Sequence, residues 1–249
     1  MPYVPLAAGR VHYAERGERA AGRTSALFIH GAGAGAVLWS MVLARVARRS
    51  HAVAIDLPGH GPSEVGARPL TLERYRDAVG GLAGTLCLGP SVLVGHSLGA
   101  LVALAAARAW PDKVRALVLC AAAPRMTVDP EVFRLLRDDP ERFVPWLADH
   151  ALSPRAKPAI RRAFLAAAAP TPPEIAAADF EIVGATDLRE HLPDLACPIT
   201  WLDGADDQIV PPALREGRRG EVVTVPAAGH LLPIEAPAAI AQAVTSLRP

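Results

Sequence analysis

Short apolar runs with strand character alternate with helix-like segments along most of this 249-residue chain. The runs lie at residues 26–30, 51–55, 91–95, 114–120, 198–204 and 221–226, and an earlier one, RVHYAERG, fits a strand of an opening hairpin. Between and after them, the pattern predicts helices at 37–49, 71–86, 97–110 and 235–247. Continuously apolar strands separated by helices indicate a parallel sheet that is buried on both faces. We therefore predict an α/β fold with a mostly parallel central sheet and helices on both sides.

Residues 124–190 interrupt this alternation, and we call this segment the helical insert. It contains no convincing strand run and carries nine prolines, which divide it into short helices. Parallel sheets of this type bind ligands in the crevice at the carboxyl ends of their strands. An insert that leaves the sheet at that edge is predicted to be a lid, with residues 1–123 and 191–249 forming the core. The alternative is a set of peripheral helices without a functional role.

The pentad Gly95-His96-Ser97-Leu98-Gly99 stands between a strand run and an alanine-rich helical run. A sharp turn from strand to helix strains the serine backbone, and only small residues fit two positions to either side. The turn exposes the serine hydroxyl beside a helix N-terminus, whose N–H groups can receive a developing oxyanion. GxSxG alone is a weak pattern, but this context favours Ser97 as a nucleophile.

A serine hydroxyl needs a general base, which is usually a histidine oriented by a carboxylate. His230 follows the last strand run on a glycine-containing loop, which can hold its ring over the sheet edge. It is the strongest candidate; the competitors are His12, His30, His51, His60, His96, His150 and His191. His12 and His51 are expected at strand starts, away from that edge. The orienting acid should follow the preceding strand, where WLDGADDQIVPP offers Asp203, Asp206 and Asp207.

The loop after the run at 26–30 is rich in glycine and alanine, which let a backbone approach a reacting carbonyl closely. We expect the oxyanion hole to use two backbone N–H groups, those of Ala32 in this loop and of Leu98 after the serine.

The same loop supports a rival interpretation. Residues 31–36 fit the dinucleotide-binding pattern GxGxx[G/A], and Asp56 ends the next strand run, 20 residues after Ala36. A nicotinamide site, however, gives no reason for a serine, an acid and a histidine to fall on three successive loops at one sheet edge. This makes the nucleophile interpretation the stronger one.

The composition excludes several classes of function. Apolar residues make up 51% and charged residues 20%, which is typical of a folded globular protein. The formal net charge of +1 argues against nucleic acid or a polyanionic partner. No segment approaches the ~20 apolar residues of a membrane span, and the N-terminal residues do not resemble a signal peptide. The widely spaced Cys87, Cys120 and Cys197 suggest reduced thiols, so we expect a cytoplasmic protein.

Together these motifs resemble those of the α/β-hydrolase superfamily. HGAGAGAVLW is similar to the family's oxyanion loop, GHSLGA to its nucleophile elbow, GADDQIVPP to its acid loop and GHLLPIEAP to its histidine loop. The resemblance covers the whole chain except the helical insert and implies an α/β-hydrolase fold. In the family's G-x-x-D acid loop, counting from Gly204 makes Asp207 the orienting acid and leaves Asp206 as a solvated turn residue. It also implies that His96 is a packing residue.

The resemblance implies a serine esterase similar to small, lidded bacterial enzymes such as carrier-protein methyl ester esterases and enol-lactonases. We expect Ser97, His230 and Asp207 to hydrolyse a small carboxylic ester, lactone or thioester through an acyl-enzyme, with no metal and no organic cofactor. The expected partner is a small acyl substrate, with no nucleic acid and no membrane. The alternatives are C–C bond hydrolysis or cofactor-free lyase chemistry with the same triad, and a non-catalytic ligand-binding homologue.

One basic cluster stands out in the helical insert. Its members, which have no acids between them, are Arg155, Lys157, Arg161 and Arg162. Such a cluster could contact an anionic substrate or a carrier protein. Because the insert also carries acids in similar number, we expect a solvated face, and a carrier-protein partner has no support from the sequence.

Overall fold

A computed structural model describes residues 2–7, 9–20, 24–66, 68–167 and 171–247. Within these ranges one eight-stranded sheet forms, in the order β1-β2-β4-β3-β5-β6-β7-β8. Its strands are β1 (Tyr3–Leu6), β2 (Gly9–Arg16), β3 (Ser25–Ile29), β4 (His51–Ile55), β5 (Ser91–His96), β6 (Val114–Cys120), β7 (Ile199–Gly204) and β8 (Glu221–Val225). β1 and β2 form an antiparallel hairpin, β2 pairs antiparallel with β4, and the remaining pairs are parallel. The predicted α/β fold with a mostly parallel sheet is confirmed.

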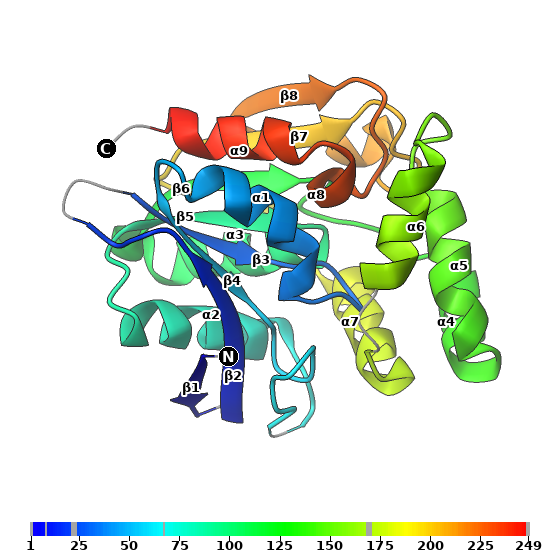
Figure 1. The fold of residues 1–249 in the computed structure, drawn as a ribbon, viewed down its shortest axis with the longest axis horizontal. Helices are drawn as coiled ribbons and strands as arrows, with labels where there is room; N and C mark the ends of the chain where they lie inside the picture. Colours follow the sequence, from blue (N-terminus) through cyan, green and yellow to red (C-terminus); the bar gives the residue numbers. More distant parts are fainter. Residues whose placement is uncertain (1, 8, 21–23, 67, 168–170, 248–249) are drawn as a thin grey trace.

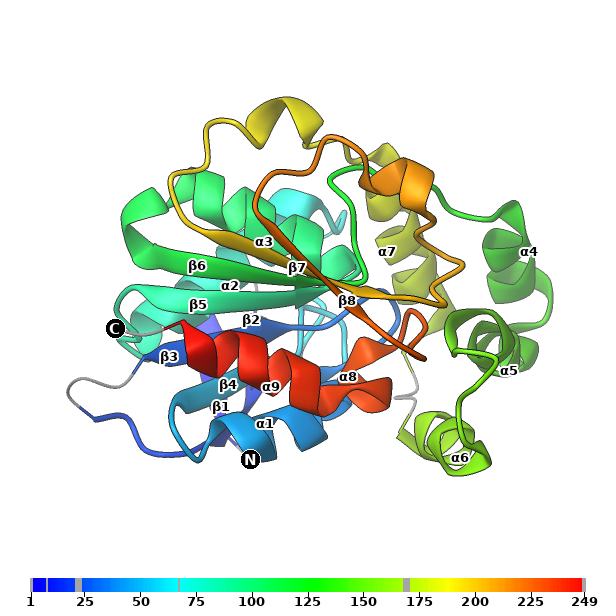
Figure 2. The ribbon, with the colours of Figure 1, turned by 90° about the horizontal axis from the view of Figure 1, so that it is seen from above.

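Helices cover both faces of this sheet, as Figures 1 and 2 show. One face carries α2 (Leu72–Thr85) and α3 (Leu98–Ala109), and the other carries α1 (Ser40–Val46) and α9 (Pro237–Ser246). Side chains of β3 alternate between the two cores that result. Leu27 and Ile29 pack with residues of α2 and α3, whereas Ala26 and Phe28 pack with residues of α1 and α9. This double burial explains why the strand sequences are continuously apolar.

One predicted helix is shorter than expected, and another is confirmed. The helix expected at 37–49 begins as a 3-10 turn (Ala36–Trp39), continues as α1 and ends at Val46. The helix expected at 235–247 is α9, and a short helix that was not predicted, α8 (Leu232–Glu235), precedes it; Pro237 lacks the N–H that would continue α8 and instead begins α9. Other 3-10 turns lie at Pro111–Lys113, Arg189–His191 and Pro212–Arg215. No helix in the described ranges combines the length and apolar character that a bilayer crossing requires.

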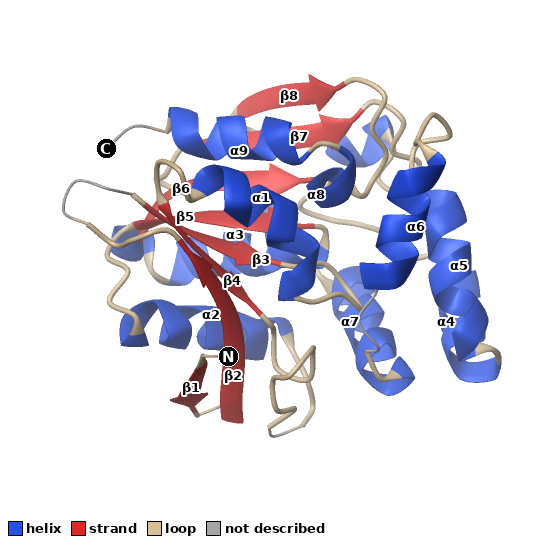
Figure 3. Ribbon diagram, in the orientation of Figure 1, coloured by secondary structure: helices blue, strands red, loops and turns tan. Residues whose placement is uncertain are grey.

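The helical insert contributes α4 (Pro130–Asp138), α5 (Pro140–Ala151), α6 (Pro158–Ala167) and α7 (Pro173–Ala185). Each of these helices begins at a proline, whose fixed φ suits the first helical position and whose missing N–H would have no partner there. The two ends of the insert meet, because Leu188 N–H donates a hydrogen bond to the Pro124 carbonyl at 2.9 Å. The four helices stand beyond the carboxyl ends of the parallel strands, at the right of Figure 3. This is the sheet edge at which the sequence places its candidate site residues.

Candidate active site

Ser97 lies at the turn between β5 and α3. Its φ of 52° and ψ of −117° are values that residues with a side chain rarely adopt. The flanking glycines make the turn feasible: a Cβ on Gly95 would lie 2.3 Å from the Gly99 carbonyl oxygen, and one on Gly99 would lie 2.2 Å from the Ile29 carbonyl oxygen. Leu98 is the first residue of α3, where N–H groups have no partner within the helix. The strained serine beside a helix N-terminus is therefore present, as the pentad predicts.

His230 and Asp207 come from neighbouring loops and meet. His230 follows β8, Asp207 follows β7, and His230 Nδ1 lies 3.2 Å from Asp207 Oδ2. The other carboxylate oxygen accepts hydrogen bonds from the N–H groups of Ile209 and Val210, at 2.9 and 3.1 Å. Burial raises the pKa of Asp207. The His230 contact and the Val210 N–H lower this pKa by more than burial raises it, so the pKa lies below its ordinary value. The ionised acid takes the hydrogen bond from Nδ1 and leaves Nε2 available as a base.

Two arginines that contact Asp203, one of which also contacts Asp207, are absent from the sequence prediction. Arg215 Nη2 lies 3.5 Å from Asp207 Oδ2, and Arg215 Nη1 lies 3.4 Å from Asp203 Oδ2. Arg218 donates hydrogen bonds to both oxygens of Asp203, which is buried. Asp203, one of the three acids considered, is thus engaged by arginines, whereas Asp207 contacts His230. No sequence pattern marks Arg215, because its contact depends on how the loop after β7 returns to the strand end.

Asp206 lies in a turn, as predicted, but its carboxylate is paired with other side chains instead of facing solvent alone. Its carboxylate accepts two hydrogen bonds from the Arg155 side chain, at 2.9 and 2.6 Å, and one from the Ser153 hydroxyl at 2.5 Å. Both partners belong to the helical insert, so Asp206 joins the insert to the loop that carries Asp207. The sequence could not indicate these contacts, because the partners lie more than 50 residues away along the chain.

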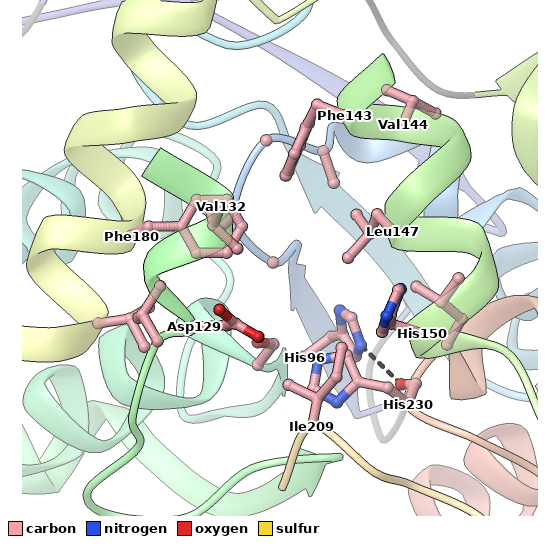
Figure 4. Close-up of a pocket in the computed structure, with 18 of the residues that line it drawn as sticks. His96, Asp129, Val132, Phe143, Val144, Leu147, His150, Phe180, Ile209 and His230 are labelled. Carbon is pink, nitrogen blue, oxygen red and sulfur yellow. Dashed lines mark hydrogen bonds between the residues drawn. The ribbon is translucent and has the colours of Figure 1, made fainter. Parts of the chain in front are cut away.

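Ser97 and His230 line the same pocket, which has a volume of about 550 Å³. In Figure 4, Phe143, Val144 and Leu147 of α5 line one side of the pocket, Val132 and Phe180 face them, and His96 and His230 lie at its base. Asp207 is not part of the lining and supports His230 from behind. Among the described residues no hydrogen bond joins the Ser97 hydroxyl to the His230 ring. The structure therefore links His230 to Asp207 directly, and brings His230 and Ser97 to one cavity.

The loop after β3 holds the peptide unit that carries the Ala32 N–H. The carbonyl of this unit belongs to Gly31, and it accepts hydrogen bonds from Ala34 N–H at 3.3 Å and from His30 Nδ1 at 2.8 Å. His30 Nε2 accepts a hydrogen bond from Leu57 N–H at 3.0 Å, so the proton of the ring is on Nδ1. The N–H and C=O of a trans peptide point in opposite directions, so these bonds set the direction of the Ala32 N–H. Ala32 lies in the pocket wall, near Ser97.

The residues of the rival dinucleotide interpretation are otherwise engaged. Asp56, which would contact a ribose, is buried; one oxygen accepts a hydrogen bond from Ala36 N–H at 2.7 Å and the other lies 2.5 Å from His12 Nδ1. The expectation that His12 lies away from this edge is wrong, because β2 runs antiparallel to β4 and brings His12 beside Asp56. Within the described ranges no group of three or more histidines, cysteines and acids is arranged to hold a metal ion.

Two buried histidines near the site carry opposite pKa shifts. Burial lowers the pKa of His96 to about 3, with a further decrease from nearby His230; its Nε2 contacts the His230 carbonyl at 2.9 Å and its Nδ1 is unpartnered. His96 is thus neutral and packs, as the resemblance implies. For His60, burial alone lowers the pKa, but Asp179, whose Oδ2 lies 2.8 Å from His60 Nε2, raises it above the ordinary value overall.

These shifts predict a maximum in the stability of the fold near pH 6.5. Below that pH the unfolded chain binds a proton at His96 that the folded chain rejects, so stability falls toward low pH by up to about 1.4 kcal/mol per pH unit for this residue. The His60 contribution is complete below its unfolded pKa and is lost as pH rises through its raised folded pKa. Urea unfolding between pH 5.5 and 8.5 measures the loss of unfolding free energy on both sides of this maximum. Replacing His96 with asparagine should reduce the loss of stability at low pH and keep the loss at high pH, and an unchanged loss at low pH would contradict this assignment.

Comparisons with known proteins agree with this geometry. The model of the alpha/beta hydrolase family matches residues 26–243. A pimeloyl-[acyl-carrier protein] methyl ester esterase from Stenotrophomonas maltophilia is 31% identical over 228 residues, which cover 82% of this chain and 85% of that protein. A thermophilic esterase from Thermogutta terrifontis is 27% identical, with a TM-score of 0.86 over 99% of this chain and 97% of that one. The enol-lactonase from Burkholderia xenovorans LB400 shares the fold, with 24% identity and a TM-score of 0.87 over 99% of each chain. The chain belongs to the alpha/beta hydrolase family.

Proposed function

We propose that the chain is a serine-type carboxylic ester hydrolase in which Ser97 is the nucleophile, His230 the general base and Asp207 the orienting acid. Ser97 Oγ attacks the acyl carbon while His230 takes its proton and then passes it to the leaving alkoxide; water, activated by His230, hydrolyses the acyl-enzyme. The N–H groups of Ala32 and Leu98 receive the oxyanion. The observation that carries this proposal is the His230–Asp207 hydrogen bond at a pocket that Ser97 also lines.

The relatives support ester hydrolysis over the other chemistries open to such a triad. Both the relative from Stenotrophomonas maltophilia and the solved structure from Thermogutta terrifontis are named esterases. A cleft of about 550 Å³ is also in the usual size range for a small-molecule site. The chain is therefore assigned to the carboxylic ester hydrolases, and ester, lactone and thioester substrates are the candidates.

The helical insert is proposed to act as the lid of this site, over a core of residues 1–123 and 191–249. Its helices α4, α5 and α7 supply much of the pocket wall, including Val132, Phe143 and Phe180. A wall of this kind excludes water from the acyl group, which strengthens every electrostatic contact made to the reacting carbonyl.

The charges around the pocket favour a neutral acyl group. The described residues that line it include no lysine or arginine, and their acid is Asp129. In the basic cluster of the insert, Arg155 is paired with Asp206 at 2.6 Å and Arg161 with Asp149 at 2.7 Å. These arginines already have carboxylate partners, which supports the solvated-face interpretation and gives a carrier-protein surface no added weight.

Esters with a neutral acyl chain should react faster than the same esters with a terminal carboxylate. We expect kcat/KM for p-nitrophenyl hexanoate to exceed that for its ω-carboxylate analogue by about tenfold or more, because the apolar wall desolvates a terminal carboxylate and the exposed Asp129 at the rim repels it. Asp129→Asn should narrow this ratio while keeping the fold, since asparagine caps a helix about as well as aspartate. Steady-state kinetics on both esters measure the ratio. A preference for the anionic ester that disappears in Arg161→Ala/Arg162→Ala would instead show that the basic cluster binds substrate.

The proposed function is tested by combining covalent labelling with a substrate series. A fluorophosphonate should label wild-type protein at Ser97, and p-nitrophenyl esters of increasing chain length should be hydrolysed until the acyl chain outgrows the pocket. Mass spectrometry of the labelled peptide locates the adduct. Absence of labelling would favour a non-catalytic binding protein. Labelling without turnover of any ester or lactone would favour C–C bond hydrolysis or lyase chemistry.

A further inference from the structure

The loop that carries Ala32 is bound to the helical insert at two points. Gly33 N–H donates a hydrogen bond to Asp179 Oδ2 at 2.9 Å, and the Gly33 carbonyl accepts one from the Thr171 hydroxyl at 3.1 Å. Asp179 belongs to α7, and Thr171 lies just before that helix. Gly33 has a φ of +63°, and a Cβ at this position would meet Ala176 of α7 at 3.5 Å. Gly33, which follows the expected oxyanion donor Ala32, thus packs against the insert.

Asp179 is itself held from three directions. It is completely buried, its Oδ2 also lies 2.8 Å from His60 Nε2, and its Oδ1 accepts a hydrogen bond from the Tyr75 hydroxyl at 2.6 Å. The other ring nitrogen of His60 faces the Pro58 carbonyl at 3.2 Å. Because both ring nitrogens face acceptors, His60 is protonated and forms an ion pair with Asp179. These partners come from the loop after β4 and from α2, so the core fixes the position of the carboxylate.

Packing alone does not require a carboxylate at this position. Buried ion pairs can often be replaced by apolar side chains of similar volume with little loss of stability. Stability therefore does not explain why a carboxylate stands at residue 179. An apolar side chain on α7 could not accept the Gly33 N–H. That N–H belongs to the peptide unit next to the one that carries the Ala32 N–H. His30 fixes one side of Ala32 through the Gly31 carbonyl, and Asp179 fixes the other side.

We infer that Asp179 is a positioning residue for ester hydrolysis, because its hydrogen bond to the Gly33 N–H holds the loop from which the Ala32 N–H meets the oxyanion. This inference rests on the proposed function, and it gives the helical insert a part in transition-state stabilisation in addition to lining the pocket. Donors that are held in place before the reaction stabilise the developing charge most strongly. A loosened loop therefore lowers kcat, whereas KM, which depends on the apolar pocket, changes little.

Four variants test this role in the full chain. Asp179→Ala removes the acceptor, Asp179→Asn keeps one acceptor oxygen, and Thr171→Val removes the second bond to Gly33. Glu181→Gln is the matched control, because it removes a carboxylate from the same helix at an exposed position and leaves the Asp179 contacts in place. We expect kcat for a p-nitrophenyl ester to fall about 100-fold in Asp179→Ala with KM within about threefold, and to fall less in Asp179→Asn and Thr171→Val. Glu181→Gln should retain kcat within about threefold, since its side chain faces solvent.

Two further measurements separate positioning from general stability. Affinity for a trifluoromethyl ketone, which forms a tetrahedral oxyanion on the serine, should fall in the same order as kcat, and amide hydrogen exchange at residues 31–36 should accelerate in that order. If Asp179→Ala does not fold, Asp179→Asn and Thr171→Val, which keep side-chain volume, still test whether the bonds to Gly33 hold the loop. An equal loss in Glu181→Gln, a raised KM with unchanged kcat, or unchanged exchange at 31–36 would overturn the inference. If wild-type protein hydrolyses no ester, the proposed function fails, while the exchange data still show whether Asp179 holds the loop.

Discussion

Ser97→Ala will lower kcat for a neutral ester by about 10⁴- to 10⁶-fold, because the acyl-enzyme can no longer form and only the oxyanion donors and the pocket remain. The unfolding free energy should stay within ~1 kcal/mol of wild type, since alanine meets the same backbone strain as serine at this turn. Steady-state kinetics with p-nitrophenyl hexanoate and urea unfolding give the two values. Fluorophosphonate labelling should disappear in the same variant.

Ser91→Ala is the matched control for this prediction. Ser91 is a buried serine at the opposite end of β5, where its hydroxyl contacts the Gly89 carbonyl at 3.1 Å. Its replacement should leave kcat within about twofold, because it lies far from the pocket lining. Near-wild-type turnover by Ser97→Ala would show that another group is the nucleophile, and the proposed mechanism would then be abandoned.

Asp207→Asn will reduce kcat by about 10⁴-fold with little change in KM, because the amide inverts the tautomer of His230. Its oxygen can still accept the N–H groups of Ile209 and Val210, so the amide nitrogen faces His230 Nδ1. Nδ1 must then accept a hydrogen bond, and Nε2 carries the proton that the base should be free to take. The fold is expected to survive, since the two backbone contacts persist.

Asp206→Asn provides the comparison one residue away. It weakens the exposed ion pair with Arg155 and the contact with Ser153. Such an exposed pair contributes little because solvent screens it, so turnover should fall by no more than about fivefold. Parallel kinetics on the two asparagine variants give the ranking. The reverse order, with the larger loss in Asp206→Asn, would move the role of orienting acid to Asp206.

Local patterns in the sequence predict the elements of this protein well where a residue's role depends on its neighbours along the chain. The apolar runs predict the strands, because a strand covered on both faces is apolar throughout. The prolines of the insert indicate that it is divided into short helices, and its four helices do begin at prolines, although Pro145 lies inside α5. The differences are small: α1 ends earlier than its apolar pattern indicates, and the short α8 before the last helix was not predicted.

In the candidate site, too, some features follow from local sequence patterns and others do not. Ser97 follows from the spacing of small residues around it, and the meeting of His230 with Asp207 agrees with their positions after neighbouring parallel strands. The contacts of Asp206 with the insert and of Arg215 with Asp207 are not visible in the sequence. Each joins side chains from separate loops, and the length and path of those loops carry no local pattern.

By itself, then, the sequence determined an α/β fold, its break at residues 124–190 and the three loops on which a serine, an acid and a histidine stand. Tertiary structure alone decided that Arg215 flanks Asp207, that Asp206 binds the insert, and that Asp179 of the insert binds the loop beside Ala32. The physical reason is the separation along the chain between the residues that interact. Secondary structure responds to the side-chain period and the backbone preferences of adjacent residues, whereas a hydrogen bond of about 3 Å between distant segments depends on the packing of the whole molecule.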